Sequence, residues 1–295
     1  MSRLPYLLAV VLAAALVSSA NASQLVDRNA RNVKLEVNAK GEALLSYSAH
    51  GKVKHVLAWG ALNAIAPTRS RPQVQLKLDY AGGWGKYRTS YWKTFKNACS
   101  AYDGPALAWY VTGCTAPDGS YWALQAWQRM LPNYGLTPSA TQAVWELRLS
   151  HWTGELPALQ ISTDWSWHQW DHLYGTFSYG GSPVYGFKAT SGGNPLDTFG
   201  RNVYVDTYDS AYGKGWKREN SFLTHTGTGV FCYSVNPHGS HPAGNGSKYR
   251  ATVEGPGVPP DVMWEGLAPG PYDKAADVAA NDAIGQLGDR QCRAN

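Results

Sequence analysis

The chain has 295 residues, a formal net charge of +5, and 16% charged against 44% hydrophobic residues. A chain of this length can bury a sizeable core without help from a metal. Its basic residues fall in short, scattered groups such as Lys214, Lys217 and Arg218. That pattern excludes the clustered basic stripe that is typical of nucleic-acid-binding proteins.

The first residues have the form of a secretory signal peptide. Arg3 gives a positive start, residues 7–17 are an unbroken apolar run, and Ala20-Asn21-Ala22 is an A-x-A cleavage site. The run is shorter than the roughly 20 residues that a transmembrane helix needs. We therefore expect residues 1–22 to be removed, no membrane span, and a secreted (extracellular or cell-envelope) location. A retained N-terminal anchor is the alternative.

Short strands separated by turn residues follow in chain order. Alternation of apolar and polar residues is clearest over 73–80, 143–151 and 157–165, and such one-sided alternation favours antiparallel sheets. Gly180-Gly181 indicates a tight hairpin. The expected strands are 33–37, 43–47, 53–59, 73–80, 106–112, 120–128, 143–151, 157–165, 173–179, 183–189, 202–208, 220–225, 229–235 and 248–254.

One helix is predicted near the C-terminal end. Asp273 can cap it, and Gly288 can end it. Its expected apolar face is Ala276, Ala279, Ala280, Ala283, Ile284 and Leu287. Together the elements predict an all-β protein: an antiparallel β-sandwich or jelly-roll-like fold with a short C-terminal helix. Residues 23–295 form the β-rich region, and the Pro-rich, polar stretch 131–141 is where two β units would divide.

The even number of cysteines predicts disulfides in an exported protein. Three pairings are open to four cysteines, and free buried thiols are the alternative. We favour Cys99–Cys114, which closes a short loop, and Cys232–Cys292, which attaches the C-terminus to the body. No C-x-x-C spacing points to a metal or redox site.

The richest group of candidate ligand-binding residues lies at 164–172. It comprises Asp164, Trp165, Trp167, His168, Trp170 and His172. Aromatic rings suit half-wet surfaces and stack on sugar faces, so a glycan-contact surface is one interpretation. Two histidines four residues apart share a metal readily on a helix but not along a strand, where each residue rises about 3.3 Å. A tryptophan-rich strand end packed on the core is the third interpretation.

Two further groups contain chemically versatile side chains. His238 and His241 lie on the Gly/Pro-rich loop 236–247, which is better explained as a polar surface loop than as a metal site. The acidic residues Asp197, Asp206, Asp209 and Glu219 could supply the paired carboxylates of a glycoside hydrolase, or hold calcium. No nucleophile-elbow, P-loop or dinucleotide motif is present, so we assign no catalytic residue, cofactor or metal.

Four motifs resemble those of uncharacterised secreted bacterial proteins. They are Gly-Trp-Gly-Lys-Tyr at 83–87, Ser-Tyr-Trp-Ala-Leu-Gln at 120–125, Gly-Val-Phe-Cys-Tyr at 229–233, and Gly-Pro-Gly-Val-Pro-Pro-Asp-Val-Met-Trp at 255–264. The resemblance covers most of the chain after residue 22. It implies export and a shared fold, and brings no activity with it.

Three functions are consistent with the sequence. The surplus of aromatic residues, 13 Trp and 18 Tyr, favours a secreted β-sandwich protein that binds carbohydrate or a cell-envelope polymer. The second is a secreted hydrolase that acts on glycans through paired carboxylates, and the third is a structural envelope module. The sequence alone leaves open whether the protein is an enzyme.

Overall fold

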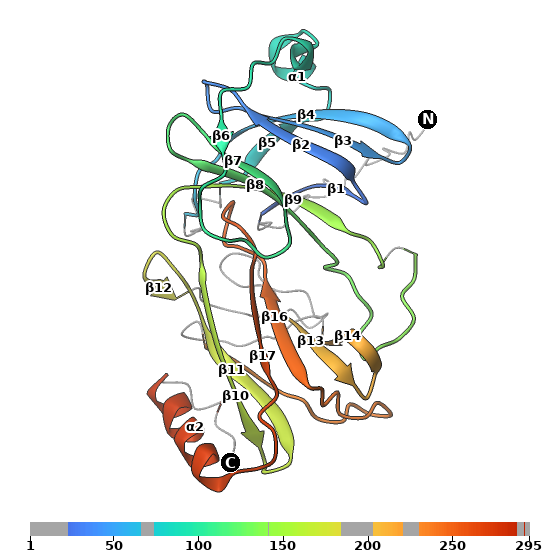
Figure 1. Cartoon of the computed structure of the whole chain (residues 1–295), viewed down its shortest axis with the longest axis vertical. Helices are drawn as coiled ribbons and strands as arrows, with labels where there is room; N and C mark the ends of the chain where they lie inside the picture. The colour runs from blue at the N-terminus through green and yellow to red at the C-terminus, as the bar shows by residue number, and fades with distance from the viewer. Residues whose placement is uncertain are drawn as a thin grey trace, which may run out of the picture.

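The computed structural model describes residues 23–65, 74–140, 142–183, 203–220, 230–287 and 292. The predicted signal peptide, Asp197, and most of the expected strands 183–189 and 220–225 lie outside these residues. The described chain is mostly antiparallel strand with one longer helix near its C-terminal end, which confirms the predicted fold class (Figure 1).

The first part of the chain forms two sheets that pack face to face. One sheet has the order β2-β3-β4-β5 and the other the order β1-β9-β8-β7-β6. Their strands are β1 (Gln24–Arg28), β2 (Arg31–Val37), β3 (Ala43–Ala49), β4 (Lys52–Gly60), β5 (Leu76–Asp79), β6 (Ser100–Ala101), β7 (Tyr110–Thr115), β8 (Tyr121–Trp127) and β9 (Glu146–Trp152).

Alternating residues of both sheets fill the core of this first sandwich. Leu45 and Val56 from one sheet and Trp122 and Leu149 from the other belong to one apolar cluster, and all four are fully buried. The predicted meander is therefore confirmed, with its alternate residues turned inward as period-two strands require. The disulfide Cys99–Cys114 closes the loop between the short β6 and its neighbour β7.

The second part of the chain forms another pair of sheets. In one, β11 pairs with β10, β12 and β15; the other has the order β14-β13-β16-β17. The strands are β10 (Ala158–Ser166), β11 (Trp170–Tyr179), β12 (Ser182–Pro183), β13 (Val203–Ser210), β14 (Gly213–Asn220), β15 (Val230–Ser234), β16 (Lys248–Val253) and β17 (Val262–Leu267). A second apolar cluster, with Phe177, Phe231, Val205 and Ala251 fully buried, lies between them.

The chain passes from the first sandwich to the second at 153–157, between β9 and β10. The stretch 131–141 connects β8 to β9, which pair directly within one sheet. One loop of the second sandwich contacts the first directly. Val258 lies in the loop between β16 and β17 and packs in the core of the first sandwich, where its carbonyl accepts the backbone N–H of His151.

Helix α2 (Lys274–Gln286) begins at the predicted cap, where Asp273 accepts the backbone N–H groups of Ala275 and Ala276. It covers the outer face of β10, β11 and β15 at the far end of the molecule from β2–β5 (Figure 1). Ala280, Ile284 and Leu287 pack there, whereas the expected face residues Ala276, Ala279 and Ala283 are exposed. The disulfide Cys232–Cys292 joins β15 to the segment after α2, so both predicted disulfides are confirmed.

Candidate functional site

The tryptophan-rich segment 164–172 forms the end of the β10–β11 hairpin. Asp164 and His172 face each other across the two strands, and His172 Nδ1 lies 2.7 Å from Asp164 Oδ1. Both side chains are buried, on the face that α2 covers. Their pairing leaves neither group open to an external ligand.

The tryptophans of this segment do not share one surface. Trp165 is buried, with its indole N–H donating to Gly270 O at 2.9 Å, and Trp170 is half-buried. Trp167, at the turn, is 60% exposed. His168 is also exposed, and its ring stacks on Tyr272 at 4.6 Å. The hairpin therefore presents one tryptophan and one histidine at its tip.

The hairpin turn has an unusual backbone for its sequence. Trp167 and His168 both have positive φ, 56° and 58°, and Gln169 N–H donates to Ser166 O at 3.2 Å. A turn with positive φ at both central residues normally takes Asn or Gly, because a side chain there is strained. His168 Nε2 also lies 3.7 Å from Asp277 on α2, so the helix helps to hold this turn in place.

The second and third candidate groups meet in one cluster of the second sandwich. Glu219 on β14 is fully buried, and Tyr233 on β15 donates to its Oε1 at 3.2 Å. The same Tyr233 hydroxyl lies 2.8 Å from His238 Nε2. Tyr134 stacks against both His238 and His241. Glu219, Tyr233 and His238 thus form a continuous polar chain from the interior to the loop 236–247.

The surroundings of Glu219 favour its protonated form. Burial raises the pKa of Glu219 to about 7, and hydrogen bonding from Tyr212 and Tyr233 offsets only part of this effect. Its Oε2 has no hydrogen-bond partner among the described residues. A carboxyl group that titrates near neutral pH is suited to acid–base chemistry.

Access to Glu219 is closed, however. The Gly244 backbone lies against the carboxyl group so closely that any side chain at residue 244 would overlap it. The cavities of about 210 Å³ beside Leu159 and about 260 Å³ beside Trp216 are not lined by Glu219. Burial also raises the pKa of Asp171, which accepts the Tyr249 hydroxyl at 2.5 Å.

The other acidic candidates have structural partners. Asp206 is buried between two arginines, with Arg218 Nε at 2.5 Å and Arg250 Nε at 2.8 Å. Asp209 accepts the backbone N–H of Gly215 within the β13–β14 turn. Within the described ranges, no three His, Cys, Asp or Glu side chains are arranged to hold a metal ion.

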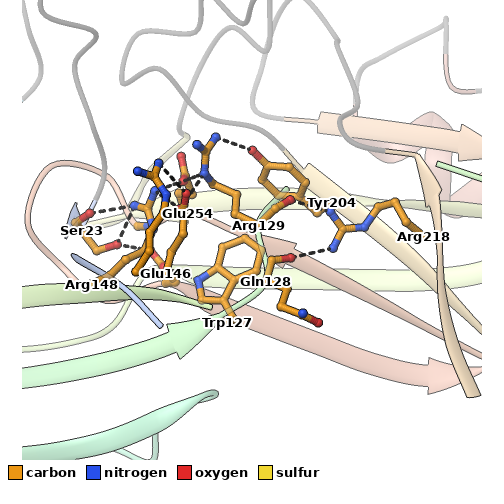
Figure 2. Close-up of polar contacts among 12 residues, drawn as sticks. Ser23, Trp127, Gln128, Arg129, Glu146, Arg148, Tyr204, Arg218 and Glu254 are labelled. Carbon is orange, nitrogen blue, oxygen red and sulfur yellow. Dashed lines mark hydrogen bonds and ion pairs between the residues drawn. The ribbon is translucent and has the colours of Figure 1, made fainter. Parts of the chain in front are cut away.

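Buried charges also join the two sandwiches (Figure 2). Glu146 on β9 contacts Arg129 at 2.9 Å and Arg148 at 3.3 Å, and Arg148 reaches Glu254, which follows β16, at 2.6 Å. Burial alone would raise the pKa of Glu146, but Arg129 and Arg148 outweigh it and hold the pKa below its usual value. Arg218 extends the network by donating to Arg129 O at 2.9 Å. Because these charges are satisfied by one another, the network is structural.

A different surface carries unpaired charge together with exposed aromatic rings. Residues 80–98 leave β5 and cross the outer face of the β2–β5 sheet, forming the short helix α1 (Trp84–Tyr87) and the turn η1 (Tyr91–Lys93) (Figure 1). Trp84 is 51% and Trp92 36% exposed. We call this surface the aromatic–basic face; its members are His55, Trp59, Trp84, Lys86, Arg88, Trp92, Lys93 and Lys96.

Ring contacts fix the aromatic–basic face to the sheet beneath it. Trp92 stacks on His55 of β4, with ring centroids 4.0 Å apart and planes 7° apart. Lys86 Nζ lies 4.5 Å from the Trp59 ring and 2.5 Å from the buried Glu42 carboxylate. Gly82 is needed where it is, because a side chain there would collide with Trp92. The Trp92 ring is therefore held in a fixed position.

This face was not predicted, although the sequence of residues 80–98 is distinctive. Residues 80–98 contain four basic and six aromatic side chains and no aspartate or glutamate. In the sequence the basic residues of this segment are separated from one another and look scattered. Only the fold shows that the segment is one continuous insertion on the β2–β5 sheet. The motif at 83–87 lies inside it.

Comparison of the chain with models of protein families, with curated proteins and with solved structures finds no match. The resemblance drawn from the four motifs therefore stays a prediction. Among the described residues, no helix combines the length and apolar character needed to cross a membrane. The two disulfides indicate an oxidising, non-cytoplasmic compartment.

Proposed function

We propose that this protein is an exported, non-enzymatic binding protein for an extracellular glycan or cell-envelope polymer, and that the aromatic–basic face is its binding surface. The observation that carries the proposal is the exposure of Trp84 and Trp92 on a face whose backbone is fixed by the Trp92–His55 stack. Rigid, exposed indole rings offer flat apolar area for sugar rings at little entropic cost. The predicted signal peptide and the two disulfides support export.

The hairpin tip is the competing location for the same function. Trp167 is the more exposed ring, but it stands without a second exposed tryptophan in segment 164–172, where Trp165 is buried and Trp170 half-buried. Single exposed aromatic residues are common on protein surfaces. The aromatic–basic face offers two exposed tryptophans on one insertion, which is why we prefer it.

A panel of soluble neutral and acidic polysaccharides tests the proposal by affinity gel electrophoresis. We expect retardation of the wild-type protein by at least one polymer, and Trp84→Ala combined with Trp92→Ala to abolish it while thermal unfolding stays unchanged within a few degrees. Trp167→Ala and the exposed Trp145→Ala serve as matched controls that should bind normally. If the panel retards nothing, or only Trp167→Ala loses binding, the proposed surface is wrong.

A glycan hydrolase is the second candidate function, and the raised pKa of Glu219 is the observation that favours it. Paired carboxylates, one of them protonated, are what such an enzyme requires. Glu219 is fully buried beneath Gly244, so a sugar cannot reach it without movement of the loop 236–247. Binding therefore remains the function that the geometry supports better.

A further inference from the structure

The charges on the aromatic–basic face are not balanced by acidic neighbours. Lys86 is neutralised by Glu42, but no acidic side chain among the described residues pairs with Arg88, Lys93 or Lys96, all of which are exposed. The flanking Asp79 is occupied by backbone N–H groups of Ala81 and Lys86. Three cations of this segment are therefore not neutralised by a described carboxylate, and one of them, Lys93, lies with its Nζ 5.5 Å from the centroid of the Trp92 ring.

The backbone conformation of Arg88 is unusual for its residue type. Arg88 ends α1 with φ 58°, in the left-handed region, and its backbone N–H donates to Trp84 O at 2.9 Å. Helix ends of this kind usually carry glycine or asparagine, because other side chains are strained there. Strain kept at a particular residue is a mark of functional sites. A guanidinium group can bind a carboxylate through two parallel hydrogen bonds, which a glycine cannot do.

From this charge pattern we propose that the ligand is a polyanionic polysaccharide, whose sugar rings stack on Trp84 and Trp92 and whose carboxylates pair with Arg88, Lys93 and Lys96. This inference rests on the proposed function and narrows its ligand class.

Anionic membranes and single-stranded nucleic acids are the other polyanionic partners to consider. Segments that lie on membranes are amphipathic helices with Lys and Arg on one face and Trp, Phe or Leu on the other, whereas α1 has only four residues and the segment 80–98 contains no Leu, Ile, Val or Met. Single-stranded nucleic acids also stack on aromatic rings beside cations, but they are not the usual polymer of the oxidising compartment that the disulfides indicate. An acidic polysaccharide is consistent with all three observations: the exposed indole rings, the basic side chains and the oxidising compartment.

De-esterified polygalacturonate and its methyl ester are suitable probes, because they share a backbone and differ in charge. We expect the wild-type protein to bind the de-esterified polymer, and its affinity to fall by about tenfold or more between about 50 and 300 mM NaCl as counterion release predicts. The triple variant Arg88→Gln, Lys93→Gln, Lys96→Gln should bind at least about tenfold more weakly.

The control is a variant with the same loss of charge at exposed lysines elsewhere: Lys52→Gln, Lys214→Gln and Lys274→Gln. It should keep wild-type affinity, and circular dichroism should show both variants folded. Equal binding of the methyl ester, with no effect of the triple variant, would overturn the acidic ligand class but leave glycan binding intact. No binding to either polymer or to neutral glycans would overturn both proposals. Tighter binding to an oligodeoxythymidine or to anionic phospholipid vesicles would replace the polysaccharide with that polymer or surface.

Discussion

The surroundings of Glu219 in the folded protein favour the protonated form of its carboxyl group. The folded protein holds that proton up to about pH 7, whereas an unfolded chain releases it near the ordinary value of 4.5. The folded state therefore binds more protons than the unfolded state between these limits. Since stability falls with pH wherever the folded state holds the extra proton, Glu219 makes the protein progressively less stable from pH 4.5 to 7.

The variant Glu219→Gln keeps the shape of the protonated acid but cannot ionise. We expect it to be more stable than the wild type at pH 8, by up to about 3 kcal/mol, and similar to the wild type at pH 4.5. Urea unfolding at the two pH values measures the difference. The exposed Glu155→Gln is the control and should show no such pH dependence. A wild-type protein that gains stability relative to Glu219→Gln between pH 5 and 8 would contradict the burial argument.

The sequence identified Glu219 and His238 as separate candidates, but it did not predict that Tyr233 would connect them. Their contact depends on Tyr233, which lies on another strand, and on β14 at Gly213–Asn220, where the expected strand began at residue 220. The segment 213–220 is polar and glycine-containing, and lacks the apolar alternation that predicts strands. Burial of Glu219 follows from this pairing, which only tertiary structure shows.

Elements with strong alternation were predictable because one face of each packs on a core. The strands of the N-terminal meander, β8–β11, β13, β15 and β16 all overlap their expected ranges. The side-chain faces were less predictable. In β9 the polar residues Glu146, Arg148 and Ser150, expected to face solvent, are buried. Glu146 and Arg148 tolerate burial because Arg129 and Glu254 pair with them. In α2, buried Asp277 contributes to the packed face in place of Ala276, since His168 and Tyr272 provide polar partners.

Helix α2 depends on the disulfide that follows it. Replacing Cys232 and Cys292 by serine removes the link between β15 and the end of the helix, and loss of a native disulfide typically costs about 2–5 kcal/mol. We expect faster amide hydrogen exchange in α2 and the β10–β11 hairpin, with little change in β2–β5. The matched variant with Cys99 and Cys114 replaced should show the opposite distribution. Equal acceleration in both sandwiches would contradict a local role for the second disulfide.

At the scale of the whole molecule, the two sandwiches are held together by charge as well as by apolar contact. Glu146 and Arg148 come from the first sandwich, and Glu254 comes from the second (Figure 2). Breaking a buried ion pair by removing one partner leaves the other charge uncompensated, which is strongly destabilising. We therefore expect the contact between the two sandwiches to tolerate replacement of all the charged residues by apolar ones better than the loss of a single charge.

The variant Glu146→Gln tests whether the buried charge network stabilises the contact between the two sandwiches. We expect it to lower the free energy of unfolding at pH 7 by about 3 kcal/mol. The lowered pKa of Glu146 means that its stabilising effect is present above the unfolded pKa of 4.5 and is lost as the pH falls further, so the difference should shrink in acid. Glu265→Gln, which breaks an exposed pair with Lys248, should cost about 1 kcal/mol or less. Equal losses from the two variants would show that burial adds nothing to the network.

The insertion that forms the aromatic–basic face and the helix α2 lie at opposite ends of the long axis (Figure 1). If the protein binds a polymer through its α1 end, its long axis points away from the polymer and the second sandwich lies farthest from it. The strained Trp167–His168 turn lies at that far end of the molecule, against α2. If the aromatic–basic face binds a polymer as proposed, the two ends of the molecule offer two separate contact surfaces, of which only the α1 end is occupied by the polymer.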